Sequence, residues 1–229
     1  MLRPSGVSAY STRVPPSNSD RATRPRSYDV TAVVRDPARY PGPADGRVRI
    51  AAGDVTDPAT VALLAEGHDA AVNAAAVYGE GTDPAAFFPA ASRALTTGLP
   101  RAGVGRLIAI GIATLLPQSQ SQSQSQPDDR THPPLLLDSP ALPPEARPFS
   151  LAHAAGLEVL RAEAPDAGAL DWVYLSPAGD FDHDAARTGR YAVRKHGDLA
   201  ARISYPDLAV AVLDEIDHPT HHRSHLAVT

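Results

Sequence analysis

The stretch YDVTAVVRDPARYPG (residues 28–42) contains an apolar, β-branched run that stops abruptly at Arg35. The run VTAVV carries no charge, which is typical of a strand buried on both faces of a parallel sheet. Arg35, Asp36 and Pro37 then mark the end of the strand and a turn. We therefore predict a central strand at residues 30–34, with its carboxyl end at Arg35.

Runs of the same kind recur along the chain, in RVRIAAGD, DAAVNAAA, RLIAIG and DWVYLSP. Helical segments with recognisable starts lie between them. Asp57-Pro58 and Asp83-Pro84 each combine an N-cap residue with proline at the first helical position. Strands that alternate with helices predict an α/β fold with a doubly wound parallel sheet, which is Rossmann-like.

The domain boundaries follow from composition. Residues 1–26 are crowded with Ser, Arg and Pro and have no apolar period, so we expect a disordered leader. Residues 27–229 are long enough for one α/β domain. Inside it, the polar repeat QSQSQSQSQ opens a low-complexity segment at 117–148, which we expect to be a mobile loop.

Composition also narrows the classes of partner. The net charge is -5 and the basic residues form no run, which argues against nucleic acid as a direct partner. No apolar stretch reaches the roughly 18 residues that span a bilayer, so we expect a cytoplasmic protein without a membrane partner. There is no cysteine, and the histidines at 218, 221, 222 and 225 lack a completing carboxylate or thiolate set, so we expect no metal site.

The residue after the second strand of a dinucleotide-binding fold selects the cofactor, because it lies beside the adenosine ribose. An acidic residue there accepts a hydrogen bond from the 2′-hydroxyl, whereas arginine pairs with a 2′-phosphate. Arg35 occupies this position, so NADP(H) is expected in preference to NAD(H). Asp54 and Val55, in GDVTD, would lie at the adenine edge. Asn73 and Ala74, in NAAA, would allow a close approach of the backbone to the cofactor.

These motifs, with GRLIAIG, LDWVYLSPAGDF, RTGRY and RISYPDLAVAVLDEIDHPTHHR, occur in one order along the chain. The ordered set resembles the NmrA-like and NADH-flavin reductase (biliverdin reductase B-like) group of atypical short-chain dehydrogenases. The resemblance covers residues 28–229 apart from the Ser-Gln segment. It implies an NAD(P)-binding Rossmann fold whose cofactor crevice is lined at Arg35, Asp54, Asn73, Gly111 and Pro177.

The chain departs from this group at its amino terminus. Members of the group begin with a short strand, a Gly-x-x-Gly-x-x-Gly turn and a helix that bind the pyrophosphate. Here only Gly6 precedes Gly42, so the first strand and the glycine-rich loop are missing or replaced. Two explanations remain: a frame error that put an unrelated leader before a family-like body, or a divergent leader that still supplies a strand. In either case the cofactor site is weakened or lost.

The catalytic residues are harder to assign. Short-chain dehydrogenases use a Tyr-x-x-x-Lys pair, and Ser150 and Ala154 stand at those positions here. YAVRK (residues 191–195) has the right spacing but lies in an extended segment, where residues four apart are about 13 Å from each other. His153 and Tyr78 are the remaining candidates. His153 lies near the position where flavin and biliverdin reductase-like members carry a histidine, or it is simply a residue on a partly exposed helix face.

The resemblance implies NAD(P)H-dependent reduction of a small conjugated substrate such as a flavin or quinone. A second reading is a non-catalytic, NmrA-like dinucleotide sensor that regulates a partner. A third is a defective, frame-shifted member of the family.

Overall fold

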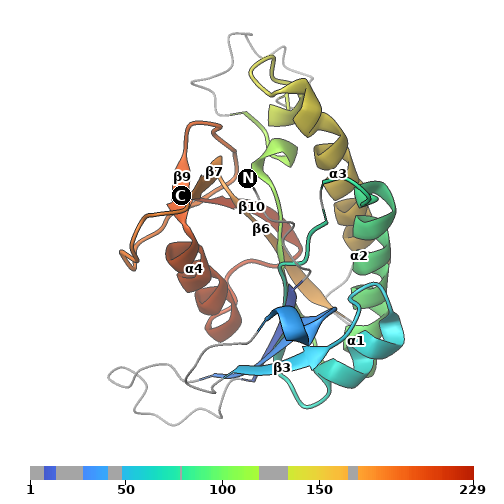
Figure 1. Ribbon diagram of the computed structural model, residues 1–229. Helices are drawn as coiled ribbons and strands as arrows, with labels where there is room; N and C mark the ends of the chain where they lie inside the picture. Colours follow the sequence, from blue (N-terminus) through green and yellow to red (C-terminus); the bar gives the residue numbers. More distant parts are fainter. Residues whose placement is uncertain (1–7, 14–27, 41–47, 78, 119–133, 165–169) are drawn as a thin grey trace.

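The computed structural model describes residues 8–13, 28–40, 48–77, 79–118, 134–164 and 170–229. Within these ranges, the centre of the molecule is an eight-stranded sheet with the strand order β3-β2-β1-β4-β5-β6-β10-β8. Helices cover both of its faces (Figure 1). The strands of this sheet are β1 (Ser8–Arg13), β2 (Asp29–Val34), β3 (Val48–Ala52), β4 (Ala70–Asn73), β5 (Arg106–Ile110), β6 (Asp171–Pro177), β8 (Val193–Arg194) and β10 (Ser224–Val228). The predicted doubly wound α/β fold is confirmed.

The helices begin where the sequence places N-caps. Asp57 accepts hydrogen bonds from the Ala59 and Thr60 amides at the start of α1, and Asp83 accepts one from Ala86 at the start of α2. These bonds satisfy amides that have no partner inside the helix. The helices are α1 (Pro58–Ala65), α2 (Pro84–Arg101), α3 (Arg147–Glu163) and α4 (Tyr205–Asp217). None of the helices in the described ranges is long and apolar enough to cross a membrane.

The sheet separates two apolar cores. Residues of α1, α2 and α3 pack on one face, where Leu99, Leu107 and Leu157 are almost completely buried. Residues of α4 pack on the other face against β5, β6 and β10, with Ile108 and Val173 at the centre. A smaller two-stranded sheet, β7 (Asp180–Asp182) and β9 (Arg202–Ser204), leads from β6 to α4.

The amino-terminal segment differs from the expected disordered leader. Residues Ser8–Arg13 form β1, which lies between β2 and β4 and pairs with both. β1 runs antiparallel to each neighbour, although β2, β3, β4, β5, β6 and β10 all run in one direction. The physical reason is that β2 and β4 each have an edge of amide and carbonyl groups that need partners, and an extended segment of any sequence can supply them. Residues 1–7 and 14–27 lie outside the described residues.

The expected mobile loop at 117–148 is also partly wrong. From Pro134 onward the segment packs on the domain, because the apolar run around Leu136 and Leu137 is buried. The Gln118 amide donates to the Pro134 carbonyl, and the Leu136 amide donates to Leu116, which closes the segment onto the residues after β5. Two short 3-10 helices follow, η3 (Leu136–Asp138) and η4 (Pro144–Ala146). Residues 119–133, which include most of the Ser-Gln repeat, lie outside the described residues.

Candidate functional site

An open groove of about 480 Å³ lies beside the carboxyl ends of β2 and β3. The register that pairs Val34 with Ala52 brings these two strand ends side by side. Arg35 follows β2 directly and Asp54 follows β3 after one glycine, so both residues reach the groove. The residues lining the groove are Arg35, Ala52, Gly53, Asp54, Thr60, Leu63 and Leu64. The structure thus brings together two residues that the sequence predicted as cofactor ligands.

Gly53 lets α1 pack close to the strand ends that form this groove. A Cβ atom at Gly53 would lie 2.6 Å from Leu64 Cδ1 and 2.7 Å from Val33 Cγ1, so no side chain fits there. The Gly53 amide also donates to the Val34 carbonyl at 3.0 Å, which fixes the end of β3 against β2. Asp54 accepts hydrogen bonds from the amide and the hydroxyl of Thr56, at 2.9 and 2.8 Å. Both bonds go to Oδ1, so Oδ2 can accept from a ligand.

The groove combines a cation with an exposed apolar side chain. Arg35 is exposed, and Leu63, on the solvent side of α1, is 71% exposed. A guanidinium pairs well with phosphate, and an apolar wall suits the face of a purine ring. Sequence reasoning missed Leu63. The available signal was the Leu63-Leu64 pair in a short helix, since only one of two adjacent residues can face the core.

The other predicted cofactor residues occupy different environments. The Asn73 side chain accepts a hydrogen bond from the Ala75 amide at 3.2 Å, which shapes the turn after β4, and Ala74 is exposed there. Val55 is only 2% exposed and packs in the core below the groove. Pro177, the last residue of β6, is buried. Their roles in cofactor binding stay predictions.

Gly111, at the end of β5, lies beneath the ring of Tyr174. A Cβ atom there would be 1.9 Å from Tyr174 Cε1 and 2.7 Å from Ser176 Oγ. The Gly111 amide donates to the Leu175 carbonyl at 2.8 Å. The absence of a side chain at residue 111 is therefore required by packing, whether or not a cofactor passes nearby.

His153 is buried, and the expectation of a partly exposed helix face is wrong. Its side chain is 4% exposed, and its Nδ1 lies 2.7 Å from the Tyr174 hydroxyl. The ring also lies against Phe88, with centroids 3.8 Å apart, and against Phe149. Burial lowers the pKa of His153 to about 3 and raises the pKa of Tyr174 above its ordinary value. The imidazole is therefore neutral at pH 7. Tyr78, the other catalytic candidate, lies outside the described residues.

A second histidine, His225, is half-buried beside this group, and the sequence did not single it out for this role. His225, on β10, places Nε2 2.9 Å from Ser176 Oγ, and its ring meets the Tyr174 ring edge-on at 5.1 Å. Burial lowers the pKa of His225 to about 3, assisted by the positive charge of Arg161 and the neighbouring His153 and opposed by a hydrogen bond with the Ile112 backbone. His153, Tyr174 and Ser176, which are buried, and the half-buried His225 thus form a polar group under the ends of β5 and β6.

Ser150 and Ala154 stand where short-chain dehydrogenases carry the Tyr-x-x-x-Lys pair, and neither can replace the tyrosine as a proton donor. Ser150 is buried, donates to the Ala146 carbonyl and accepts from the Thr114 hydroxyl, each at 3.0 Å. Ala154 packs against the core. The alternative match fails as expected, because Tyr191 donates to Asp214 at 2.7 Å and Val193–Arg194 is strand β8.

The carboxy-terminal histidines have separate partners. His221 Nδ1 lies 2.6 Å from Glu215 Oε1, and His222 Nδ1 lies 2.7 Å from Asp171 Oδ2. No group of three or more His, Asp or Glu residues in the described ranges is arranged to hold a metal ion. These contacts belong to a buried ion network around Arg106, at the amino end of the sheet.

Comparison with known proteins agrees with this architecture. The sequence model of the NAD(P)H-binding family matches residues 20–219, and the chain belongs to that family. The protein YwnB of Bacillus subtilis (strain 168) is 30% identical over 216 residues, which cover 91% of this chain and 90% of YwnB.

Solved structures are similar over most of the chain. A Bacteroides thetaiotaomicron protein provisionally named an epimerase has a TM-score of 0.66 at 26% identity, covering 86% of this chain and 83% of its own. A Streptococcus pneumoniae TIGR4 protein provisionally named an NADH-flavin reductase has a TM-score of 0.63 at 24% identity, covering 86% and 85%. The fold is thus that of Rossmann-like NAD(P)-binding proteins.

The described residues fit one end of a dinucleotide and not its middle. The groove at Arg35 offers a cation, a carboxylate and an apolar wall to an adenosine phosphate. The pyrophosphate normally binds at a glycine turn and a helix amino terminus that follow the first strand. Here β1 is antiparallel, so its carboxyl end, Arg13, pairs with Asp29 at the opposite edge of the sheet. The described residues therefore place no such turn or helix where the pyrophosphate would lie.

Proposed function

We propose that this chain binds NADPH mainly through its adenosine 2′-phosphate end, in the groove beside Arg35, and that it derives from NADPH-dependent reductases of flavins or quinones. The observation that carries this proposal is the presence of Arg35, Asp54 and the exposed Leu63 around one groove at the strand ends. Membership of the NAD(P)H-binding family supports it. The likeness in fold to a protein provisionally named an NADH-flavin reductase is consistent with the substrate class.

Arg35 is the residue expected to separate NADPH from NADH. Its guanidinium can pair with the 2′-phosphate through two charge-assisted hydrogen bonds, a contact that NADH cannot make. Arg39 is a matched control, because it lies four residues away, is also exposed, and pairs with Asp36 at 3.8 Å instead of lining the groove. The two arginines therefore differ in position and not in chemistry.

The test is a calorimetric titration of both cofactors into the unmodified chain, Arg35→Ala and Arg39→Ala. We expect Arg35→Ala to weaken NADPH binding by roughly 10- to 100-fold, the equivalent of one charged hydrogen bond, and to change NADH binding little. Arg39→Ala should change neither by more than about threefold. An equal loss of both cofactors in Arg35→Ala would contradict the assignment.

A second function, a dinucleotide sensor without turnover, is favoured by the environment of His153 and Ser150. Both side chains are buried, and each already has a hydrogen-bond partner. No group is therefore presented to a substrate at the positions where short-chain dehydrogenases place their acid. Oxidation of NADPH followed by absorbance, with FMN or the quinone menadione as acceptor, separates the two functions. Turnover above the rate without protein supports the reductase, and cofactor binding without turnover supports the sensor.

A further inference from the structure

Three aromatic side chains gather on the surface where the small sheet meets α4. Phe181 lies on β7, and Tyr205 directly follows β9 at the first position of α4. The rings of Phe181 and Tyr205 are stacked, with centroids 4.0 Å apart and planes inclined by 16°. The ring of His183 lies 5.4 Å from that of Tyr205 and 6.5 Å from that of Phe181. We call these three residues the aromatic platform.

Hydrogen bonds fix the backbone beneath the aromatic platform. Phe181 pairs with Ile203 in the parallel ladder of β7 and β9, and Ile203 is buried in the core under α4. Asp182 accepts hydrogen bonds from the amides of Asp184 and Ala185, at 3.3 and 3.1 Å, which shapes the turn directly after β7. A site on a backbone that is already ordered loses little conformational entropy when a ligand binds.

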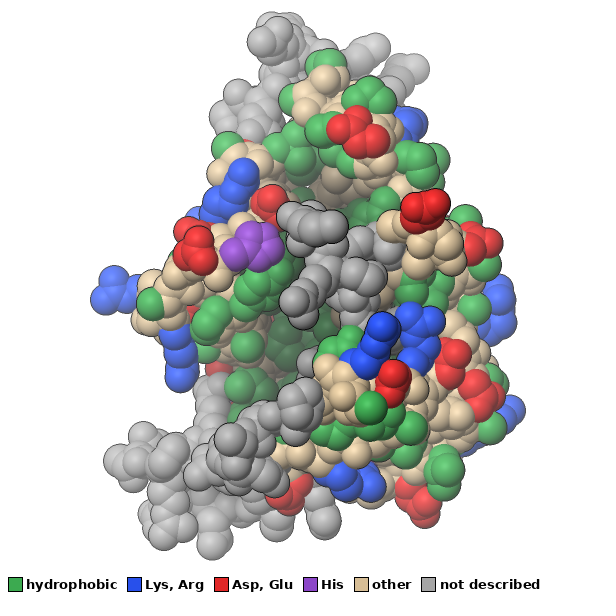
Figure 2. Space-filling view, viewed as in Figure 1, with side chains coloured by type: hydrophobic (Ala, Val, Ile, Leu, Met, Phe, Trp, Pro, Cys, Tyr) green, Lys and Arg blue, Asp and Glu red, His purple; other side chains and the backbone are tan. Residues whose placement is uncertain are grey.

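The outer side of the aromatic platform meets solvent. Tyr205 is 50% exposed and His183 is exposed, whereas Phe181 is half-buried and packs against the core under α4. Figure 2 shows hydrophobic side chains gathered beside α4, with a histidine at their edge. Single exposed apolar residues are common on protein surfaces, but a stack of rings that ends in a half-exposed tyrosine presents a flat apolar surface. Such a surface suits a planar, conjugated ligand.

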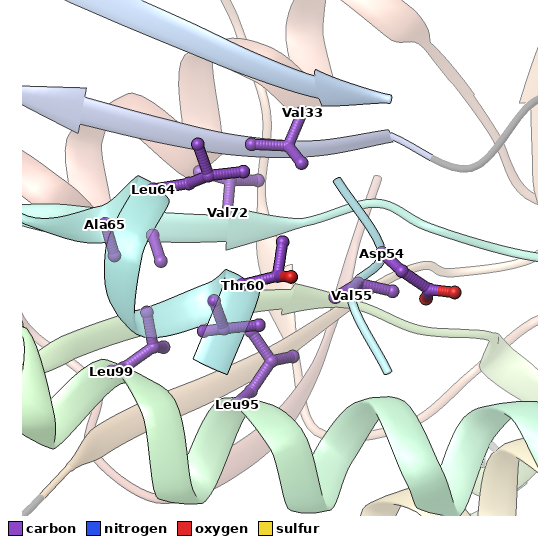
Figure 3. Close-up of a pocket in the computed structure, with 11 residues that line it drawn as sticks. Val33, Asp54, Val55, Thr60, Leu64, Ala65, Val72, Leu95 and Leu99 are labelled. Carbon is purple, nitrogen blue, oxygen red and sulfur yellow. The ribbon is translucent and has the colours of Figure 1, made fainter. Parts of the chain in front are cut away.

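The aromatic platform lies at the carboxyl edge of the main sheet, away from the adenosine groove. β7 begins at Asp180, three residues after β6 ends at Pro177. Ligands of open α/β sheets bind outside this edge. The groove at Arg35 uses Thr60 and Leu64, which project from α1 on the face of the sheet opposite α4 (Figure 3). The platform and the groove are therefore separate sites.

We propose that the aromatic platform binds the isoalloxazine ring of a flavin, stacked on Tyr205 with its polar edge beside His183. The isoalloxazine ring is planar and electron-poor, and it stacks favourably on the electron-rich ring of a tyrosine. The imidazole of His183 offers a hydrogen-bond donor and an acceptor to the carbonyl and nitrogen atoms at the edge of the isoalloxazine. The choice of a flavin rests on the proposed function, whereas the stacking itself needs no nucleotide.

The probe is riboflavin, which carries the isoalloxazine ring without a phosphate. Stacking on tyrosine quenches flavin fluorescence, so the full-length chain is titrated into riboflavin and the quenching is recorded. We expect saturable quenching in the absence of NADPH. Adenosine 2′,5′-bisphosphate should not displace riboflavin, because that nucleotide is expected in the groove at Arg35. The absence of saturable quenching, or displacement of riboflavin by this nucleotide, would overturn the proposal.

Substitutions of Tyr205 test whether its ring carries the binding. Tyr205→Phe keeps the ring and should stay within about twofold of the unmodified chain, whereas Tyr205→Leu keeps only apolar bulk and should lose at least about fivefold in riboflavin affinity. Tyr40→Leu, the same change at a half-buried tyrosine after η1 (Pro37–Arg39), should have less than about a twofold effect. Equal affinities of Tyr205→Phe and Tyr205→Leu would contradict the proposal.

Two further variants keep the test decisive. Tyr205→Trp presents a larger ring and should bind riboflavin at least as tightly, so weaker binding would count against stacking even if Tyr205→Leu did not fold. Arg35→Ala should bind riboflavin as the unmodified chain does. A chain that binds riboflavin and not NADPH would contradict the groove assignment alone, and one that binds NADPH and not riboflavin would contradict the aromatic platform alone.

Discussion

At the scale of single residues, the end of β5 depends on a contact between Gly111 and the Tyr174 ring. A methyl group at residue 111 would lie 1.9 Å from Tyr174 Cε1, so the ring must move. That movement would break the 2.7 Å hydrogen bond between the Tyr174 hydroxyl and His153. We expect Gly111→Ala to lower the free energy of unfolding by about 2–4 kcal/mol, from overpacking and one lost buried bond.

Gly105, just before β5, provides the control for this prediction. A Cβ atom there meets no heavy atom within 4 Å, and its backbone is not in the left-handed region. Gly105→Ala should change stability by no more than about 0.5 kcal/mol in urea denaturation. Similar losses in the two variants would show that the Tyr174 contact is not the cause.

The residue scale also shows where sequence reasoning stops. The proximity of Arg35 and Asp54 was predictable because Arg35 directly follows one recognisable strand and Asp54 follows another after one glycine, and strand ends meet at one edge of a parallel sheet. The contact of His153 with Tyr174 joins residues 21 positions apart, and that of Ser176 with His225 joins residues 49 apart. No local pattern encodes such pairs, since they depend on how α3 and β10 lie on the sheet.

At the scale of elements, Arg106 holds the amino end of the sheet to the end of α4. Its guanidinium donates to Asp171 at 2.6 Å and to Glu215 at 2.9 Å, and its side chain is 9% exposed. Burial by itself would raise the pKa of Glu215, but hydrogen bonds from Thr220 and His221 lower it below its ordinary value. The Glu215 carboxylate therefore stays charged and needs Arg106.

Replacing Arg106 by leucine removes the arginine from Glu215 and leaves Asp171 with the more distant Arg223, at 3.8 Å. We expect Arg106→Leu to lower the free energy of unfolding by about 3–5 kcal/mol, as is usual when one member of a buried ion pair is removed. Arg161→Leu is the control, because Arg161 pairs with Glu158 on the exposed surface of α3, and it should cost less than about 1 kcal/mol. Chemical denaturation of both variants at pH 7 measures these changes. Comparable losses in the free energy of unfolding would argue against a structural role for the Arg106 network.

The elements themselves divide into those with and those without a sequence signal. β2 to β6 were predictable because each contains an apolar run, and α1 and α2 because Asp57 and Asp83 cap them in the expected way. β1 was not, because SAYSTR has neither an apolar run nor alternation. It forms a strand because the facing edges of β2 and β4 need hydrogen-bond partners. The position of β1 is therefore determined by β2 and β4 and not by its own sequence.

At the scale of the whole molecule, His153 and His225 make the free energy of unfolding depend on pH. The pKa values of His153 and His225 fall from 6.5 to about 3 on folding. Between these limits the unfolded chain binds protons that the folded chain does not, so stability rises with pH through this window and is fully present above about pH 6.5. Each histidine should contribute up to about 1.4 kcal/mol per pH unit.

Urea denaturation from pH 7.5 down to pH 5 measures this dependence. We expect a flat region above about pH 6.5 and a steady loss below it. His225→Gln should reduce the slope below pH 6.5 by about half, because one of the two histidines no longer titrates. An unchanged slope in that variant, or constant stability down to pH 5, would show that His153 and His225 are not neutral in the folded chain.

The central claim is that the described residues of this chain keep the adenosine end of a dinucleotide site and do not form its pyrophosphate end. The most direct measurement compares the affinities of NADPH and adenosine 2′,5′-bisphosphate, which carries the adenosine and the 2′-phosphate alone, by calorimetry on the unmodified chain. If the claim holds, the two ligands bind with Kd values within about threefold of each other, because no glycine turn or helix amino terminus among the described residues offers backbone donors to the pyrophosphate. A glycine turn and helix would add at least two charge-assisted hydrogen bonds, so binding of NADPH that is more than about a hundredfold tighter would contradict the claim.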